Sequence, residues 1–389
     1  MVRCPANFLL ARIPMMKRLL LRCVVLVLLT APMARAQRQL HSGVRAASDS
    51  TDAFARRIMR ERRIPGMQVA VVQHGKIVLA RAYGIANVED SVPVTSQTVF
   101  PIASVTKAFT GVAIMQLVEA GKLDLSAPIS RYVDSLPATW QVVNVRQLLT
   151  HMSGLPDIWD ADARMIAPDP DTAWAMAQAR PVAFVPGERF QYVQTNYVLL
   201  GKIIERLSGE PFMQFVRDRQ MNVVGMPNSG FGDSWDVVPR SARTYWFFEN
   251  AGQARLPTKD LRADVRNWPA MVRPAVGVNT TATELARWVI AVQGGKLLKA
   301  STSLTTMWTA GVLNDGSHQG FSPLINGYAL GWPVVIRPQH RAIAPTGGGK
   351  AAVFIYPNED LAVVVLTNLF GAAPQSFVDE LAGYFRAVR

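Results

Sequence analysis

Ser104 and Lys107 are the residues whose types and spacing best suit nucleophilic chemistry. They are three positions apart in the run Ser-Val-Thr-Lys, where a polar loop leads into an apolar stretch. In a helix, residues three apart lie on one face a single turn from each other, so the amine can take the proton of the hydroxyl. The alternative is that Ser104 only caps a helix and Lys107 extends into solvent.

The residues that follow Ser104 predict a helix that is buried on all sides. From Val105 to Ala120 nearly every position is apolar, and Gly121 supplies a stop. A lysine in such a helix is costly to bury as a cation, so its amine is expected to lose its proton readily, as a general base at neutral pH must. Ser104 would lie at the helix start, where free N–H groups and the helix dipole favour an oxyanion.

The first 36 residues are typical of a secretory signal peptide. They contain six basic residues and no acidic one, and the apolar run at 23–30 is too short to span a bilayer. Ala34-Arg35-Ala36 fits a cleavage site before Gln37. We therefore predict a signal peptide over 1–36, a linker over 37–50, and a bacterial protein that is exported to the periplasm or secreted. No stable membrane anchor is expected after signal removal.

Composition argues against several other classes of protein. Both cysteines, Cys4 and Cys23, fall in the predicted signal peptide, so neither disulfides nor cysteine-bound metals are expected in the mature chain. Without the six basic residues of that segment, 35 basic and 28 acidic residues remain, and the formal net charge changes from +13 to +7. No zinc spacing, phosphate-binding glycine loop or basic patch with interleaved aromatic residues occurs, so nucleic acid is not an expected partner.

The elements that must position Ser104 come from both ends of the sequence. Strands are predicted at 67–73, 76–82, 328–336, 351–356 and 361–367. The first two meet at His74-Gly75, which favours a hairpin, and helices are expected at about 51–63 and 374–388. This order predicts an α/β fold of the α+β type, with one antiparallel sheet built from N- and C-terminal parts and flanked by helices. A helical lobe at about 136–272 would be inserted in a single domain over 51–389.

The region from about 228 to 272 is rich in Trp, Phe, Arg and Asp but has no clear periodicity. Its aromatic residues could line a pocket for an apolar acyl group, or they could pack a long covering segment. The sequence leaves both possibilities open.

Several ordered stretches resemble the serine β-lactamase and penicillin-binding-protein superfamily, in the branch of class C β-lactamases, D-alanyl-D-alanine carboxypeptidases and related esterases. The resemblance runs from about residue 52 to 385, and its stretches are Pro101–Thr110, Leu148–Pro156, Pro186–Tyr192, Asn196–Gly201 and Val363–Asn368. It implies a β-lactamase-like fold, and it supports Ser104 as nucleophile and Lys107 as base. No metal or organic cofactor is implied.

The resemblance places Tyr192 on the tyrosine of the family's Tyr-x-Asn element. This phenol would share proton transfer with the lysine, and as a phenolate near a cationic amine it could activate the deacylating water. The third position here is Gln194, which keeps an amide donor and acceptor but adds one methylene. His151 belongs to the pattern Leu-Thr-His-Met-Ser-Gly-Leu and is expected to be scaffolding.

The third family element, Lys-Thr-Gly or His-Thr-Gly, corresponds to Pro345-Thr346-Gly347 followed by Gly348. By resemblance, the N–H groups of Ser104 and Gly348 form the oxyanion hole, and Gln194, Thr346 and Gly347 contact substrate. Pro345 replaces the basic or imidazole side chain that helps bind a substrate carboxylate. Lys350 either reaches back to substitute for it or extends into solvent from a turn.

These residues predict an exported serine hydrolase that works through an acyl-enzyme on ester or amide substrates. Because Pro345 lacks a cation, an esterase or peptidase-like activity is favoured over efficient β-lactamase activity. The expected partner is a small acyl ester, an amide or a peptide. The alternative is a non-catalytic protein of the same fold that binds acyl or peptidoglycan fragments, since two of the three motifs are altered.

Overall fold

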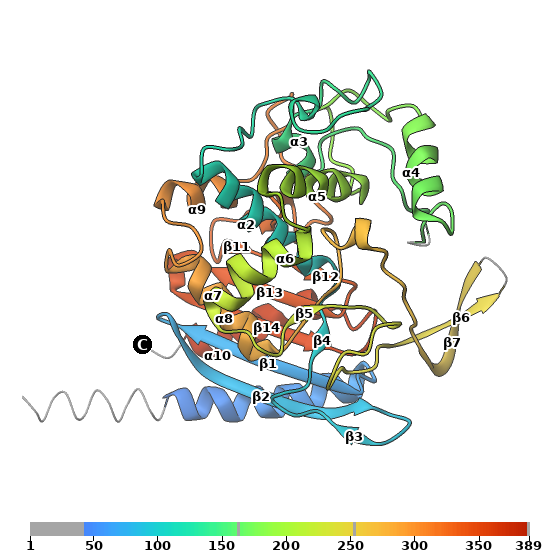
Figure 1. Ribbon diagram of the computed structural model, residues 1–389. Coiled ribbons are helices and arrows are strands. Elements are labelled where there is room, and N and C mark those ends of the chain that lie inside the picture. Colours follow the sequence, from blue (N-terminus) through green and yellow to red (C-terminus); the bar gives the residue numbers. More distant parts are fainter. Residues whose placement is uncertain (1–42, 162–163, 252–253, 387–389) are drawn as a thin grey trace, which may run out of the picture.

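The computed structural model describes residues 43–161, 164–251 and 254–386, and an antiparallel sheet lies at its centre (Figure 1). The sheet has nine strands in the order β3-β2-β1-β14-β13-β11-β10-β9, and β12 pairs with β13 beside this path. The strands are β1 Gly66–Gln73, β2 Lys76–Asn87, β3 Val92–Pro93, β9 Gly327–Tyr328, β10 Pro333–Val335, β11 Ala342–Ile343, β12 Thr346–Gly347, β13 Ala351–Tyr356 and β14 Leu361–Thr367. The predicted signal peptide lies outside the described residues.

Pairing of β1 with β14 joins the two ends of the domain, as the sequence predicted. Met67 is opposite Thr367 and Gln73 is opposite Leu361, so the strands pair along their full length. β1 and β2 form the predicted hairpin, and His74 and Gly75 at its turn have φ of 50° and 69°. Two successive positive φ values match the twist that a two-residue hairpin turn requires.

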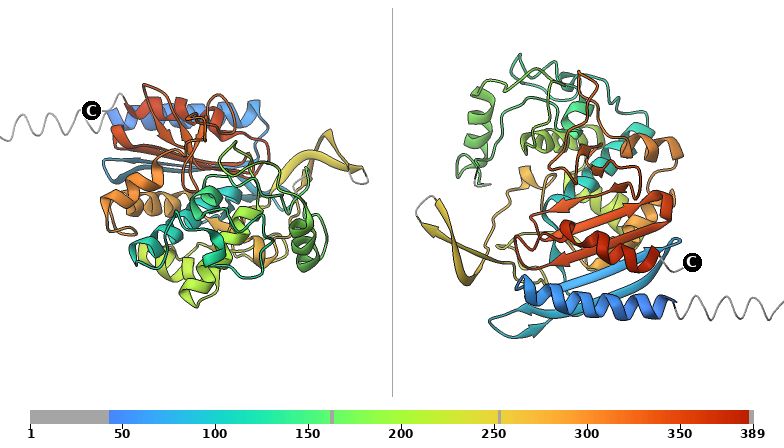
Figure 2. Two further views of the ribbon diagram at one scale, coloured as in Figure 1. Left: turned by 90° about the horizontal axis from the view of Figure 1, so that it is seen from above. Right: turned by 180° about the vertical axis from the view of Figure 1, so that it is seen from behind.

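Both faces of the sheet are covered, which explains why its central strands are continuously apolar. Along β14, Val363 and Val365 face one core, whereas Val364 and Leu366 face the other. The helix described over residues 43–61 and α10 (Val378–Arg386) cover the first face, as the view from behind shows (Figure 2). The helix over 43–61 takes in residues 43–50 of the predicted linker, because Ala47 is buried there together with Phe54.

The remaining helices are α2 Thr106–Glu119, α3 Val145–Leu149, α4 Pro170–Ala179, α5 Thr195–Ser208, α6 Phe212–Val216, α7 Asn222–Val224, α8 Ala282–Gln293 and α9 Ser301–Trp308. They form a helical layer on the second side of the sheet, in which α8 packs directly against β1, β2 and β14, whereas α2 packs against α5, α6 and α9. α2 runs through the middle of this layer and is buried on nearly every side, as predicted. Within the described part of the chain, no helix is both long enough and apolar enough to cross a membrane.

The aromatic region without periodicity contains a β-hairpin, which the sequence did not predict. Its strands, β6 (Tyr245–Ala251) and β7 (Ala254–Ala263), project from the body of the molecule (Figure 1). Pro257 lies within β7, and the register shifts between Trp246 and Phe248, so polar and apolar residues do not alternate regularly. β5 (Gly230–Phe231) and β4 (Phe100–Pro101) flank β8 (Val278–Thr280) in a small second sheet.

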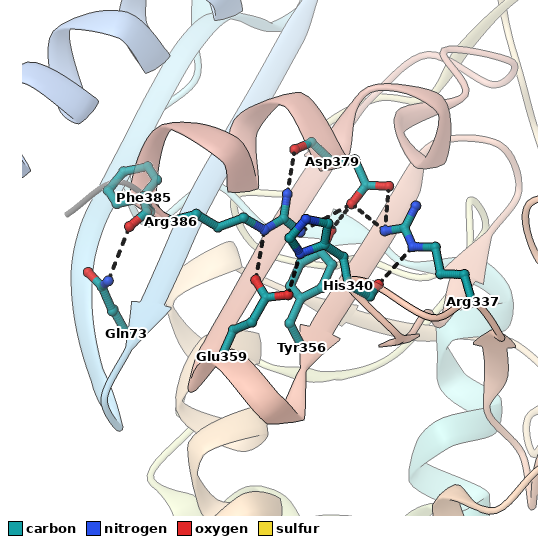
Figure 3. Close-up of polar contacts among 8 residues, drawn as sticks. All are labelled: Gln73, Arg337, His340, Tyr356, Glu359, Asp379, Phe385 and Arg386. Atoms are coloured by element: carbon teal, nitrogen blue, oxygen red, sulfur yellow. Dashed lines mark hydrogen bonds and ion pairs between the residues drawn. The ribbon is translucent and has the colours of Figure 1, made fainter. Parts of the chain in front are cut away.

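A network of charged side chains ties α10 to the sheet (Figure 3). The Arg337 guanidinium donates to both carboxylate oxygens of Asp379 at 2.9 Å, and the Tyr356 hydroxyl donates to the same carboxylate at 2.6 Å. Glu359 accepts from Arg386 at 2.7 Å. Because Asp379 is the shared acceptor, the docking of α10 depends on this residue.

We expect Asp379→Ala to lower the free energy of unfolding by about 2 kcal/mol, because Arg337, Tyr356 and Arg386, which donates from Nη2 at 3.4 Å, lose a charged acceptor. Glu61→Ala is the control, since Glu61 forms an exposed ion pair with Arg57 at 3.6 Å, and such pairs contribute about 0.5 kcal/mol or less. Urea unfolding followed by circular dichroism measures both variants. Equal losses in the two would show that the Asp379 network does not hold α10.

Candidate active site

Ser104 lies in a short 3-10 helix, Ala103–Val105, that leads directly into α2. Ala103 has a φ of 46°, a left-handed conformation that is costly for a residue with a Cβ and is typical of functional sites. β12 passes close to this turn: a Cβ on Gly347 would lie 2.0 Å from the Ile102 carbonyl oxygen and 2.9 Å from the Ser104 nitrogen. Only glycine therefore fits at position 347.

The Lys107 amine lies beside Ser104, as the helical spacing predicted. Its Nζ is 3.4 Å from Ser104 Oγ, and it donates to Gln194 Oε1 at 2.7 Å and to the Ala275 carbonyl at 3.1 Å. A neutral amine has two N–H bonds and one lone pair. If the two carbonyl oxygens take both N–H groups, the lone pair is left for the Ser104 hydroxyl. The extra methylene of Gln194 does not prevent contact with Lys107.

Burial favours this neutral form of Lys107. The side chain is 1% exposed, and desolvation lowers its pKa well below the ordinary lysine value. The carboxylate of Asp157 acts in the opposite direction and raises the pKa of Lys107. The two effects differ in size, and desolvation is the larger one.

Asp157 is a site residue that the sequence analysis missed. Its Oδ1 accepts the Gln194 N–H at 2.8 Å, just before α5, and the Trp159 N–H at 3.3 Å. Burial raises the pKa of Asp157 to about 6, and these hydrogen bonds partly offset the shift. In the sequence it is a single acidic residue after Pro156, with no spacing that marks it.

Tyr192 contacts both members of the Ser104–Lys107 pair. The Lys107 nitrogen lies 4.7 Å from the centre of the ring, and the neighbouring Ser104 side chain acts to lower the pKa of the phenol. Burial raises the pKa of Tyr192, and the negative charge of Asp157 adds to that shift. Tyr192 is therefore a protonated phenol at neutral pH, which disfavours the phenolate role suggested by the sequence.

His151 packs beneath Tyr192, with ring centres 4.3 Å apart. Its Nδ1 accepts the Val193 N–H at 3.2 Å, and the residue is fully buried with a φ of 58°. Burial lowers the pKa of His151 well below its ordinary value. These contacts position the tyrosine, which agrees with the predicted scaffolding role.

The predicted third element forms the strand beside Ser104. Thr346 and Gly347 make up β12, and Gly348 follows with a φ of 56°. Gly348 lines the same cavity as Ser104, and its role with Ser104 in an oxyanion hole stays a prediction. Thr346, Gly347 and the buried Pro345 are not part of the cavity wall.

The cavity at Ser104 has a volume of about 620 Å³, within the range of small-molecule sites. Its wall includes Tyr192, Gln194 and Asp157, together with the stacked rings of Trp159 and Trp268, whose centres are 5.2 Å apart. Of the aromatic residues in region 228–272, Trp268 thus lines the pocket, whereas Trp235 is 75% exposed. In the described ranges, no group of three or more His, Cys, Asp or Glu side chains could hold a metal ion.

Lys350 also lines this cavity, so the alternative in which it extends into solvent is wrong. The residue is 7% exposed, and its ammonium donates to Thr244 Oγ1 at 3.0 Å. Thr244 belongs to the segment that enters the unpredicted β6–β7 hairpin. No pattern in the sequence indicates this contact, because the hairpin itself was not expected.

A serine beside a buried amine and a phenol, at the junction of an antiparallel sheet and a helical layer, defines the β-lactamase and penicillin-binding-protein class of fold. The chain belongs to the Beta-lactamase family, whose model matches residues 51–383. The predicted resemblance and the predicted fold class are therefore confirmed.

Individual relatives share 26% to 32% of their aligned residues with this chain. Protein flp of Staphylococcus aureus (strain MW2) is 26% identical over 344 residues, which cover 85% of this chain and 65% of that protein. The chain thus spans slightly less than two thirds of the length of this relative. Esterase EstB of Burkholderia gladioli is 32% identical over 200 residues, 46% of this chain and 50% of EstB. The octameric penicillin-binding protein homologue from Pyrococcus abyssi has a TM-score of 0.72 at 26% identity, with 87% of this chain and 76% of that chain covered.

The decrease of kcat/KM at acid pH should depend on the interaction of Asp157 with Lys107. Removal of the carboxylate lowers the pKa of Lys107 further, so the amine stays neutral to lower pH. We expect Asp157→Asn to move the acid limb of kcat/KM for an ester toward lower pH, with little change on the high-pH plateau.

Asp160→Asn is the matched control for this shift, because Asp160 lines the same cavity but is exposed. Its acid limb should coincide with that of the wild type. An acid limb that stays in place in Asp157→Asn, or moves to higher pH, would contradict the electrostatic role of Asp157.

Proposed function

We propose that this protein is a serine hydrolase that acts through an acyl-enzyme on ester or amide substrates. The observation that carries the proposal is the environment of Lys107: two carbonyl acceptors for its N–H groups, almost complete burial, and Ser104 Oγ at 3.4 Å. A lysine kept only for stability would have no need of a hydroxyl next to its nitrogen.

In the proposed acylation step, Lys107 takes the Ser104 proton as Oγ bonds to the substrate carbonyl carbon. The carbonyl oxygen becomes an oxyanion held by the N–H groups of Ser104 and Gly348. Tyr192 gives its phenol proton to the leaving group and regains one from the Lys107 ammonium. The bond to the leaving group breaks, the acyl group remains on Ser104, and Lys107 is again neutral. Water then enters and repeats the sequence with Ser104 as leaving group.

The cavity supports small acyl esters or amides as substrates. Trp159 and Trp268 give part of its wall an apolar character, which suits the carbon chain of an acyl group. The name of the relative EstB as an esterase agrees with an ester substrate. Pro345 occupies the position of the family's basic or imidazole residue, so that residue's contact with a β-lactam carboxylate is missing. This absence favours esters and amides over β-lactams as substrates.

Ser104→Ala should reduce hydrolysis of p-nitrophenyl butyrate by more than about 1,000-fold, because the nucleophile and its acyl intermediate are lost. Ser241→Ala is the matched control: it makes the same change in the wall of the same cavity and should keep activity within about threefold of the wild type. Release of p-nitrophenol measures both, and mass spectrometry of the intact protein measures the acyl adduct.

The alternative is a non-catalytic protein that binds acyl or peptidoglycan fragments. Equal rates in the wild type and Ser104→Ala would favour it. The same conclusion would follow if the wild type hydrolysed no ester, penicillin or peptide substrate.

The proposed weakness toward β-lactams is tested at position 345. A lysine there would add a cation for the β-lactam carboxylate, so Pro345→Lys should raise the acylation rate by a penicillin about tenfold, the effect of one charged hydrogen bond. Pro345→Ala removes the proline ring without adding a charge and is the control. Stopped-flow acylation with a fluorescent penicillin measures the rates. An unchanged rate in Pro345→Lys, or an equal rise in both variants, would contradict the reasoning from Pro345.

We further propose that the protein is exported, to the periplasm or out of the cell. This proposal depends on the predicted signal peptide over residues 1–36 and its cleavage site before Gln37.

A further inference from the structure

The rings of Trp159 and Trp268 join two distant segments in the wall of the cavity, and the proposed mechanism does not use them. Trp159 lies in the loop between α3 and α4, whereas Trp268 follows β7. The rings are stacked, with centres 5.2 Å apart and planes inclined by 23°. Both residues line the cavity. Rings in direct contact leave no space for a hydrocarbon chain between them, so the wall is closed where the two segments meet.

The loop that carries Trp159 is anchored beside the proposed base. The Trp159 N–H donates to Asp157 Oδ1 at 3.3 Å, and the same oxygen accepts the Gln194 N–H at 2.8 Å. The neighbouring Ile158 N–H donates to Thr195 Oγ1 at 2.9 Å. Because the Gln194 side chain also contacts the proposed base, the position of Trp159 is tied to that of the reacting groups.

Trp268 is held by a buried ion pair. Its N–H donates to Asp233 Oδ2 at 2.7 Å, and the same oxygen accepts from Arg273 Nη2 at 3.0 Å. The Asp233 side chain is only 2% exposed, so these charge-assisted hydrogen bonds are protected from water. Both tryptophan side chains are half-buried and pack against the core on the second face of the sheet. Backbone hydrogen bonds and packing thus hold the two rings in place.

The acyl chain is the part of the substrate that this wall would limit. In the proposed mechanism the acyl group stays bonded to Ser104 through both steps, whereas the leaving group departs after the first. The cavity of about 620 Å³ has to hold the acyl group while water enters. A chain that reaches the stacked rings can extend further only by separating them, which would break their contact and the packing behind them.

We propose that Trp159 and Trp268 set the maximum length of the acyl chain, so that the protein prefers esters or amides of short-chain acyl groups. The inference rests on the proposed hydrolase function, because it names the class of substrate for the same cavity. It assigns the two tryptophans as residues that determine specificity and gives them no part in proton transfer.

A series of p-nitrophenyl esters from acetate to dodecanoate tests this assignment. In the wild type, kcat/KM should be highest for a short chain and should fall for longer ones. Trp159→Ala and Trp268→Ala each remove a ring from the wall and should raise the decanoate-to-butyrate ratio of kcat/KM by at least about tenfold, since room for a single methylene group can change kcat/KM by about that factor. The double variant should gain little beyond either single one, because either change opens the same wall.

Trp235→Ala is the matched control, because Trp235 is 75% exposed and lies outside the cavity wall. It should keep the wild-type ratio, and Trp159→Phe, which retains an aromatic ring, should stay close to it. Circular dichroism checks the fold of every variant, and leucine replaces alanine at either position where the alanine variant fails to fold. An unchanged ratio in the folded variants at both positions, or an equal rise in Trp235→Ala, would overturn the proposal.

A second series varies the leaving group instead. Butyrate esters of straight-chain alcohols from ethanol to decanol keep the acyl chain constant, and their relative rates should be the same in the wild type and in Trp159→Ala. A change confined to this series would mean that the stacked rings limit the leaving group, and it would contradict the assignment to the acyl chain.

A binding measurement separates this proposal from the proposed function. Ser104→Ala lacks the nucleophile, so the methyl ketones 2-hexanone and 2-decanone are titrated calorimetrically into it and into Ser104→Ala/Trp159→Ala. The double variant should bind 2-decanone at least about tenfold more tightly than Ser104→Ala does, with little change for 2-hexanone. This result supports the wall even if the wild type hydrolyses no ester. If no ester is hydrolysed, equal binding of 2-decanone by both proteins, or binding by neither, overturns the proposal.

Discussion

The burial of the Lys107 amine is the constraint on which the rest of the site depends. An amine inside a protein keeps its proton only at a high cost, so almost complete burial produces a base without any neighbouring cation. Burial also requires acceptors for the N–H groups, and Gln194 and Ala275 provide them from two other segments. α2 must therefore be covered on all sides, which explains its position inside the helical layer, where it packs against α5, α6 and α9.

Close packing of two backbones completes the site. β12 approaches the turn before α2 so closely that Gly347 has no room for a side chain. This approach depends on the pairing of β12 with β13 and of β13 with β14, hence on the C-terminal part of the sheet. Ser104 and Lys107 come from the first third of the chain, Tyr192 from its middle and Gly348 from its end. The antiparallel sheet joins these segments, so the site forms only when the whole domain folds.

Sequence alone could predict the elements whose burial leaves a regular pattern. β13 and β14 have the predicted bounds because both are continuous apolar runs between turns, and α2 follows from its uniform apolarity. The β6–β7 hairpin lacks such a pattern because it projects from the core and contains Pro257. Asp157 and Lys350 could not be placed for a related reason: a single charged residue in a loop has no periodicity, and packing by distant segments decides whether it is buried.

Two lysines close to Ser104 illustrate how surroundings determine chemistry. Lys107 faces carbonyl oxygens inside an apolar helix, and desolvation outweighs the attraction of Asp157, so the neutral, basic form of the amine is favoured. Lys350 faces a hydroxyl and the Asp264–Arg266 pair, and the lowering of its pKa stops at about 8. The surroundings of Lys107 thus favour an amine without its proton, whereas Lys350 stays mostly cationic at neutral pH. The surroundings of each lysine, and not the residue type, therefore determine whether its amine is favoured in the neutral or in the cationic form.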